Sequence, residues 1–392
     1  MKSINSYKEL IAELKEKSLY RQLRTIDAVS GTCVSRAGRS LINFASNDYL
    51  GLTQHPKVKM AAADAAQRFG AGSGASRLIT GTLALHSELE ARLTAFKQTR
   101  AALTFESGYA AALGTIPALF GQGDVIILDK LAHASLIDGA RLSGAEIRVY
   151  PHNRLERLSE LLDWARQKRR DAKILIITES IFSMDGDSCP LPEIVDLKDE
   201  FGAALLLDEA HAIGVLGPNG AGLAAECGLT DRVEIQLGTL SKAIGSSGGF
   251  IAGSASLIDL LINRARTFIY STAPPPAAIA AAIEGLGIIA SKTGDQLRDA
   301  LRRNHQELTT KLQHPKPDAA RSAIVPIIVG SEEQALSLAE ALLERGFLVP
   351  AVRFPTVPRG SARLRLTLSA AHRRQDIVDL GEAINALLGG KR

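Results

Sequence analysis

The chain has 392 residues, of which 46% are hydrophobic and 22% are charged. This composition is typical of globular domains and excludes a disordered or fibrous chain. At about 150 residues per domain, the length predicts two or three domains. The 46 basic and 42 acidic residues leave a net charge of only +4, spread along the chain, which argues against a nucleic-acid-binding protein.

The three cysteines, Cys33, Cys189 and Cys227, lie far apart and form no C-x-x-C pair. We therefore expect no disulfide framework and no metal site, and free thiols fit a reducing compartment. The first twenty residues place apolar residues at helical spacing among charges, unlike a secretion signal. No apolar run reaches the ~20 residues of a membrane span. These features predict a soluble, cytoplasmic protein with no membrane partner.

The chain begins with an amphipathic helical pattern and a short extended segment punctuated by glycine. From there to about residue 250, short apolar runs alternate with amphipathic helical patterns such as 83–96 and 155–168. Most runs are apolar at every position, which is typical of parallel strands covered on both faces, and the alternation predicts an α/β fold with a mostly parallel central sheet. The runs are 101–105, 125–128, 147–150, 174–178, 203–207, 235–237 and 249–252.

Three consecutive prolines, 274–276, interrupt this pattern because proline continues neither a helix nor a central strand. An alanine-rich helical stretch follows, then a strand-like run at 323–329, a helix near 332–345 and a second run at 362–368. We therefore expect three parts, which are an N-terminal helix with a short extended segment (1–46), a large α/β domain (47–274) and a small C-terminal α+β domain (275–392).

Ligands of open α/β sheets bind outside the carboxyl ends of the strands. The residues that follow the apolar runs are therefore candidates for one site, and several of them are ionisable or small and polar. They are 106–109, 129–133, 179–187, 208–211 and 238–242.

The string Asp208-Glu209-Ala210-His211 also occurs in helicases, but this chain has no G-x-x-x-x-G-K-[ST] phosphate loop, so a helicase is excluded. What remains is a carboxylate at the end of a buried strand, with a histidine three residues later. The alternative is that Asp208 only caps the next helix.

Two glycine-rich segments fit known motifs poorly. The segment 70–74 resembles a dinucleotide fingerprint, but it lacks the last glycine and follows a helical pattern instead of a strand. The segment 245–249 matches G-x-S-x-G, yet a strand-like run follows where a nucleophile elbow needs a helix. We predict a glycine-rich loop near a ligand for the first, and no hydrolase site for the second.

Two further segments fit a phosphorylated ligand and a reactive amine. Gly108 and Tyr109 open a helix directly after a strand, where free N–H groups and the helix dipole favour a phosphate. Lys242 lies among small residues, in a confined setting that favours the neutral amine of an imine-forming lysine. Thr239, three residues earlier, is placed to reach a phosphate. The alternative for Lys242 is a loop lysine without a role.

Together these residues fit pyridoxal 5'-phosphate, which needs an imine-forming lysine, a carboxylate for its ring nitrogen and a phosphate cradle. Lys242 and Asp208 supply the first two, and His133 can stack on the ring. Gly108, Tyr109 and Thr239 supply the cradle. We expect the large domain to bind this cofactor.

The strings 43–52 (NFASNDYLGL), 208–211 (DEAH) and 238–242 (GTLSK) resemble those of the α-oxoamine synthases. The resemblance extends from about Arg21 to the C-terminal helix. It implies the aspartate-aminotransferase fold (fold type I), a homodimer, and condensation of an amino acid with an acyl thioester with release of carbon dioxide.

Further strings resemble the family member of biotin biosynthesis, which implies L-alanine and a pimeloyl thioester as substrates. They are 72–78, 183–187, 270–272, 355–358 and 362–372. Coenzyme A and an acyl carrier protein both remain open as the pimeloyl carrier. The alternatives are a synthase of the family that uses glycine with an acetyl or succinyl thioester, and a non-catalytic relative, which we expect to lack the lysine.

The resemblance also implies roles for single residues. Lys242 would bond the cofactor, Asp208 would pair with the ring nitrogen, and His133 would stack on the ring. His211 and Ser183 would lie at the phenolic oxygen of the ring. Gly108, Tyr109 and Thr239 would hold the cofactor, with Thr272 reaching the phosphate from the partner subunit.

For the substrates, the resemblance implies that Arg21 and Thr356 contact the acyl group, and that Asn47 and Arg365 lie at the amino-acid carboxylate, which arginine can bind bidentately. His133 would also face the substrate. One departure is visible, because Ala212-Ile213 follows the histidine of the Asp-x-x-His string where a small residue is expected in place of isoleucine. This departure leaves the local packing open.

Overall fold

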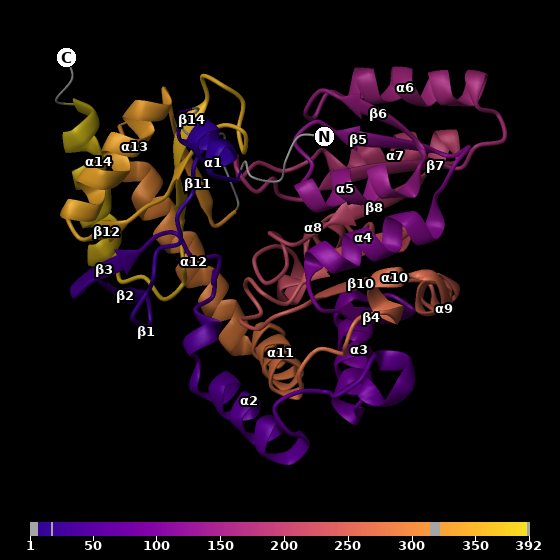
Figure 1. The fold of residues 1–392 in the computed structure, drawn as a ribbon, viewed down its shortest axis with the longest axis horizontal. Coiled ribbons are helices and arrows are strands. Elements are labelled where there is room, and N and C mark those ends of the chain that lie inside the picture. Colours follow the sequence, from indigo (N-terminus) through magenta and orange to yellow (C-terminus); the bar gives the residue numbers. More distant parts are fainter. Residues whose placement is uncertain (1–6, 17–18, 314–321, 390–392) are drawn as a thin grey trace.

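A computed structural model of the chain describes residues 7–16, 19–313 and 322–389. Its centre is a seven-stranded sheet of order β4-β10-β9-β8-β7-β5-β6 (Figure 1). Only β10 runs in the direction opposite to the other six strands, so the predicted mostly parallel sheet is confirmed. The strands are β4 (Ala101–Phe105), β5 (Val125–Asp129), β6 (Glu146–Tyr150), β7 (Ile174–Glu179), β8 (Ala204–Asp208), β9 (Ile235–Thr239) and β10 (Gly249–Gly253), one for each of the seven apolar runs.

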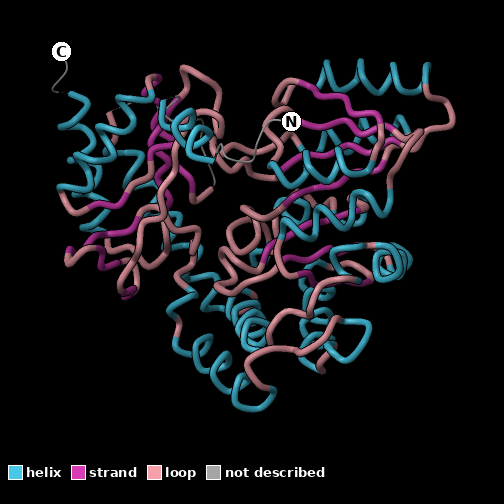
Figure 2. The backbone as a smooth tube through the Cα atoms, viewed as in Figure 1, coloured by secondary structure: helices cyan, strands magenta, loops and turns pink. Residues whose placement is uncertain are grey.

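Helices cover both faces of this sheet, as Figure 2 shows. Along β7, Ile174 and Ile176 pack in one core cluster and Leu175 and Ile177 in another. Both faces of the strand are therefore buried, which explains why its sequence is almost entirely apolar. One face carries α6 (Leu155–Lys168), α7 (Leu191–Phe201) and α8 (Leu223–Glu226), and the other α4 (Gly108–Leu119), α5 (Ala134–Ser143), α9 (Ala255–Arg264) and α10 (Arg266–Ile269).

Two small sheets lie beside the large one. The first joins the N-terminal strands β1 (Ala28–Ser30), β2 (Cys33–Arg36) and β3 (Arg39–Asn43) to β12 (Phe347–Leu348). The second contains β11 (Ile324–Gly330), β14 (Ala362–Thr367) and β13 (Ala351–Val352), accompanied by α12 (Lys292–Lys311), α13 (Glu332–Glu344) and α14 (Arg374–Gly389). Where the sequence predicts only a short extended segment before residue 46, the structure has three strands that pair with one another. The distant strand β12 adds a fourth strand beside β3.

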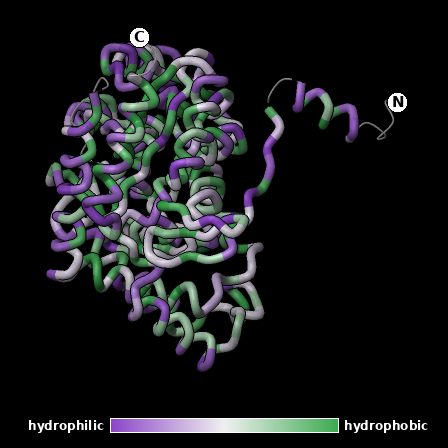
Figure 3. Tube along the Cα trace, turned by 90° about the vertical axis from the view of Figure 1, so that its left-hand side faces the viewer, coloured by the Kyte–Doolittle hydropathy of each residue, from purple (hydrophilic) through white to green (hydrophobic). Residues whose placement is uncertain are grey.

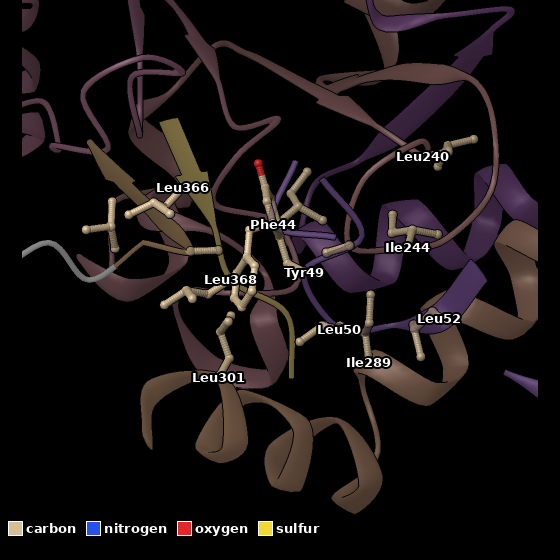
Figure 4. Close-up of a cluster of buried hydrophobic side chains, with 14 of the residues drawn as sticks. Phe44, Tyr49, Leu50, Leu52, Leu240, Ile244, Ile289, Leu301, Leu366 and Leu368 are labelled. Atoms are coloured by element: carbon tan, nitrogen blue, oxygen red, sulfur yellow. The ribbon is translucent and has the colours of Figure 1, made fainter. Parts of the chain in front are cut away.

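The largest core cluster joins segments that are far apart in the chain (Figure 4). Leu50 and Leu52 follow β3, Ile244 follows β9, and Ile289 and Leu366 come from the C-terminal third. Around this cluster, α2 (Pro56–Phe69) and α3 (Ala84–Lys97) pack against α11 (Pro276–Ile289). The division of the chain at residues 46 and 274 stays a prediction.

The N-terminal helix α1 (Tyr7–Glu16) buries none of its residues and stands away from the rest of the molecule (Figure 3). Among the described residues, no single helix is long and apolar enough to span a bilayer, and only the bent pair α11 and α12, with 77° between its two helices, meets the criteria of length and composition.

Candidate active site

The strand ends of the large sheet bring the central groups together. Glu179 ends β7 and Asp208 ends β8, and the two residues are paired in the register of the parallel strands. Lys242 follows the next strand, β9. Since the carboxyl ends of parallel strands meet at one edge of the sheet, two buried carboxylates and one amine converge there, as the sequence predicts for Asp208 and Lys242.

A directed chain of hydrogen bonds runs from Lys242 through His211. The Lys242 Nζ atom is 2.8 Å from His211 Nε2, and His211 Nδ1 is 2.5 Å from the Tyr49 hydroxyl oxygen. That hydroxyl donates to Asn47 Oδ1 at 3.3 Å. A neutral imidazole has one donor and one acceptor, so His211 donates through Nδ1 to Tyr49 and accepts through Nε2 from the amine.

The pKa values in this chain favour neutral groups. Burial, reinforced by the charge of Lys242, lowers the pKa of His211 well below its ordinary value. Burial lowers the pKa of Lys242 to about 8, although the charges of Asp208 and Glu179 oppose the shift. Burial raises the pKa of Tyr49 to about 12. A neutral amine, which is the nucleophilic form of lysine, is thus within reach near neutral pH.

One oxygen atom of this carboxylate pair lacks a hydrogen-bond partner within the described chain. Burial raises the pKa of Asp208 and that of Glu179, and Lys242 opposes both shifts. Asp208 Oδ1 accepts the Ala210 N–H at 2.9 Å, whereas Glu179 Oε1 is buried with no hydrogen-bond partner among the described residues. Such a pair favours a positively charged, hydrogen-bonding ligand, which the protonated ring nitrogen of pyridoxal phosphate provides.

His133 caps α5, close to this pair. Its Nδ1 atom is 2.8 Å from Ser135 Oγ and accepts the Ser135 N–H at 3.3 Å. Burial lowers the pKa of His133, and the charge of Asp208 partly opposes the shift. A neutral imidazole beside Asp208 presents a flat, uncharged face of the kind that stacks on an aromatic ring.

The start of α4 presents free backbone N–H groups beside Thr239. The Ser107 side chain accepts the Ala110 N–H at 3.0 Å, which leaves the N–H groups of Gly108 and Tyr109 without an acceptor in the described chain. A Cβ atom on Gly108 would lie 3.7 Å from Thr239 Cβ, so the helix start and Thr239 are neighbours. Free N–H groups at the start of a helix, with a hydroxyl beside them, suit a phosphate.

Arg365 of β14 connects the C-terminal sheet to the site. Its Nε atom donates to the Ser183 carbonyl oxygen at 2.6 Å, and both terminal nitrogens lie 3.2–3.3 Å from Asn47 Oδ1. The structure therefore brings Asn47, Ser183 and Arg365 together, and Asn47 joins them to the Tyr49–His211–Lys242 chain. A buried guanidinium here suits the carboxylate of an amino acid.

The side chains of four predicted site residues are not bonded to these central groups within a single chain. Tyr109 is partly exposed, and its hydroxyl donates to Asp138. Thr272 pairs with Ser76 and lines a cavity of about 320 Å³ beside the loop 72–74. Arg21 and Thr356 are exposed. Within the described chain, none of the four makes a hydrogen bond with Lys242, Asp208 or His211. Their roles, like those of the other site residues, stay predictions.

Tyr49 and Glu179 take part in the site without a role predicted from the sequence. Tyr49 lies within the string 43–52, and its ring packs beside Phe44 and Leu50 with the hydroxyl oxygen at the end away from Leu301 (Figure 4). Its contact with His211 joins residues 162 positions apart, which no local pattern reveals. Glu179 was among the candidate site positions 179–187 because it follows the strand-like run 174–178, but it had no assigned role.

The structure explains the departure at Ile213. This side chain is buried, and a Cβ atom added to Gly238 would lie 2.5 Å from Ile213 Cδ1. The glycine thus leaves the room that the larger residue occupies, and the Asp208–His211 segment keeps its place. Among the described residues, no group of three or more His, Cys, Asp or Glu side chains could hold a metal ion.

Comparison with known proteins identifies the family of the chain. The family model for aminotransferase class I and II matches residues 39–384. An 8-amino-7-oxononanoate synthase of Geobacter sulfurreducens is 47% identical over 379 residues, which are 96% of this chain and 95% of that protein.

Two solved structures are also similar. A structure of SPT, a serine palmitoyltransferase, with a pyridoxal phosphate internal aldimine superposes with a TM-score of 0.93 and 31% identity, covering 100% of this chain and 99% of the other. An 8-amino-7-oxononanoate synthase of Francisella tularensis superposes with a TM-score of 0.75 and 29% identity, covering 90% and 98%.

Proposed function

The chain belongs to the aminotransferase class I and II family, and from this premise we propose how its residues carry out its reaction. Its activity is that of an 8-amino-7-oxononanoate synthase of biotin biosynthesis, with pyridoxal phosphate as cofactor. The substrates are L-alanine and a pimeloyl thioester, which yield 8-amino-7-oxononanoate, carbon dioxide and a free thiol. The observation that carries this function is the identity of 47% over nearly the full length of a curated synthase.

Sequence identity decides between two activities on one fold. The serine palmitoyltransferase structures match the fold at a TM-score of 0.93 but share only about 31% of residues, whereas the curated 8-amino-7-oxononanoate synthases share 43–48%. Because a fold hosts many activities and side chains set the substrate, the higher identity carries more weight. It also disfavours the alternative synthase that uses glycine, and the presence of both Lys242 and Asp208 disfavours a non-catalytic relative.

The residues of the chain fit the cofactor. Lys242 would bond it, Asp208 would hold the ring nitrogen protonated, and His133 would face the ring. His211 and Ser183 would lie at the phenolic oxygen of the ring. The helix start at Gly108, with Thr239, would hold the phosphate. When bound, the cofactor supplies an electron sink that stabilises negative charge on the amino-acid α-carbon.

Substrate binding and proton transfer are then tasks of the chain itself. Arg365 and Asn47 orient the carboxylate of L-alanine, since the guanidinium is buried and aimed by its bond to the Ser183 carbonyl oxygen. The neutral Lys242 amine accepts the proton from the α-carbon as a general base. His211, held at Nδ1 by Tyr49, keeps that amine aligned through the 2.8 Å contact at Nε2.

A second copy of the chain completes the proposed site. Along α1, apolar side chains are exposed, with Tyr7 at 69%. Near the Ser76–Thr272 bridge, Ile79 and Tyr270 are 75% and 71% exposed. Exposed apolar groups on two separate surfaces are typical of a covered interface. A homodimer accounts for them and would bring Thr272 and Arg21 to the partner's cofactor and acyl group, with Thr356 also at the acyl group.

The pimeloyl group is carried on coenzyme A or an acyl carrier protein, and we expect the enzyme to work in the cytoplasm.

Thiol release from pimeloyl-coenzyme A is measured with L-alanine, glycine or L-serine as the amino acid, together with the mass of the product. Release that depends on L-alanine, with the mass of 8-amino-7-oxononanoate, is expected. A preference for glycine or serine would refute the substrate assignment, and light scattering that reports a monomer would refute the homodimer.

The variant Asp208→Asn tests the proposed partner of the ring nitrogen. Loss of the carboxylate removes the group that keeps the nitrogen protonated, so turnover should fall at least about a hundredfold, while the circular dichroism spectrum stays that of the wild type. Turnover near that of the wild type would refute the role of Asp208.

A further inference from the structure

Outside the Lys242 site, the imidazole of His152 lies between two carboxylates. His152 follows β6, and its Nδ1 atom is 3.1 Å from Asp129 Oδ1 while its Nε2 atom is 2.7 Å from Asp187 Oδ2. The ring also meets Phe182 edge-on, with the centroids 4.3 Å apart. Because an ionised carboxylate only accepts hydrogen bonds, both ring nitrogens must donate, and the ring is an imidazolium.

Asp129 ties the first of these contacts to the loop that leads to His133. Its carboxylate, which is fully buried, accepts the N–H groups of Leu131 at 2.8 Å and Asn153 at 3.0 Å. The loop from Asp129 continues directly into the cap of α5, which is His133. The contact with His152 therefore holds the base of the loop that presents His133.

Asp187 ties the second contact to the loop that carries Ser183. This loop is a hairpin that two backbone hydrogen bonds close. The Phe182 N–H donates to the Asp187 carbonyl oxygen at 2.9 Å, and the Gly186 N–H donates to the Phe182 carbonyl oxygen at 2.8 Å. On its other side, β14 holds the loop through Arg365 at the Ser183 carbonyl oxygen and through Arg363, 2.5 Å from Asp185 Oδ1. The hairpin is thus held on one side by two arginines of β14 and on the other side by His152, which follows β6.

We propose that His152 is a positioning residue whose cation ties the loop of His133 to the hairpin of Ser183 and thereby holds both at the Lys242 site. The charged groups that face the ring are Asp129 at the end of β5 and Asp187 in the hairpin, and Phe182 and Asn153 are its neutral neighbours. The inference rests on the proposed roles of His133 and Ser183.

The ionisation of the group agrees with this geometry. Burial by itself lowers the pKa of His152, but the hydrogen bonds and charges of Asp129 and Asp187 outweigh it and raise the pKa to about 10. A pKa raised on folding contributes stability that is complete below the ordinary value of about 6.5 and is lost as the pH rises through about 10. The charged hydrogen bonds of His152 with Asp129 and Asp187 therefore persist at neutral pH.

Three variants of the full-length enzyme test the proposal. His152→Gln keeps a donor but loses the charge, His152→Arg keeps the charge, and His305→Gln is the matched control. His305 is a partly buried histidine of α12, and its Nε2 atom has no hydrogen-bond partner in the described chain. Because small displacements of catalytic groups are costly, kcat/KM for L-alanine should fall roughly ten- to hundredfold in His152→Gln, with a shifted absorption band of the bound cofactor. His152→Arg should recover most of both, and His305→Gln should change neither.

A second measurement does not depend on catalysis. In the cofactor-free protein with ¹⁵N-labelled histidine, the two ring nitrogens of His152, assigned by their loss in His152→Gln, should both show protonated shifts at pH 8. A neutral ring at that pH would overturn the inference whatever the activity. A lower melting temperature in His152→Gln, with kcat/KM and the cofactor band unchanged, would also overturn it. If the wild type does not condense L-alanine, the proposed function fails. The protonation state of His152 then still tests whether this residue is charged between Asp129 and Asp187.

Discussion

A buried ion pair behind the active site offers a sharp test of what holds the Asp208–His211 segment. Lys97 ends α3 and donates to Glu209 and to the Ala221 carbonyl oxygen, and its side chain and that of Glu209 are 1% and 0% exposed. Glu209 also accepts the Ala224 N–H at 2.9 Å. With Lys97→Met, this carboxylate keeps its burial but loses its cation, and only one neutral donor remains.

The expected cost follows from that geometry. Removing one partner of a buried pair typically costs about 3–5 kcal/mol, because the other charge stays desolvated. The double variant Lys97→Met/Glu209→Gln removes both charges and should recover a large part of this loss. The matched control on the same helix is Arg92→Met, since Arg92 and Glu88 form an exposed pair with side chains 49% and 44% exposed. Such a pair contributes at most about 1 kcal/mol.

The assay is urea unfolding of the cofactor-free protein at one protein concentration. The single tryptophan, Trp164 in α6, reports by fluorescence, and far-UV circular dichroism tests whether the transitions coincide. The free energy of unfolding should fall in the order wild type, Arg92→Met, double variant, Lys97→Met. A loss below about 1 kcal/mol for Lys97→Met, or a double variant no more stable than the single one, would refute the reasoning.

Three further predictions concern the cofactor and substrate. In Gly249→Ala, the new Cβ would lie 2.4 Å from the Gly108 nitrogen, so the start of α4 must shift. The affinity for the cofactor, measured by equilibrium dialysis, should therefore fall at least about tenfold. An unchanged affinity would contradict phosphate binding at the start of α4. Arg365→Lys loses the fork that reaches Asn47 and the Ser183 oxygen together, so KM for L-alanine should rise about tenfold, and an unchanged KM would place the carboxylate elsewhere. Because burial lowers the pKa of Lys242 from 10.5 to about 8, cofactor uptake by the cofactor-free protein should rise with pH and level off above about pH 8. Uptake that is independent of pH between 7 and 9 would refute the shift. The same shift means that Lys242 adds to the stability of the folded protein as the pH rises from about 8 towards 10.5.

The sequence alone was sufficient for the central sheet and for the groups at its strand ends. The seven apolar runs became β4 to β10 because strands covered on both faces need apolar residues at every position, a signal contained within five or six residues. Asp208 and Lys242 follow such runs, and parallel strands end at one edge of the sheet, so the convergence of these two residues was predictable from the sequence.

Only the tertiary structure decided which distant segments complete the site. Tyr49 meets His211 across 162 positions, Asn47 meets Arg365 across 318, and β3 pairs with β12 from the other end of the chain. The two contacts of His152 span 23 and 35 positions. Local periodicity reports which face of an element is apolar, whereas these contacts depend on how whole elements pack. For that reason the strands and the reactive lysine were predictable from the sequence, and the hydrogen-bond chain that aligns the lysine was not.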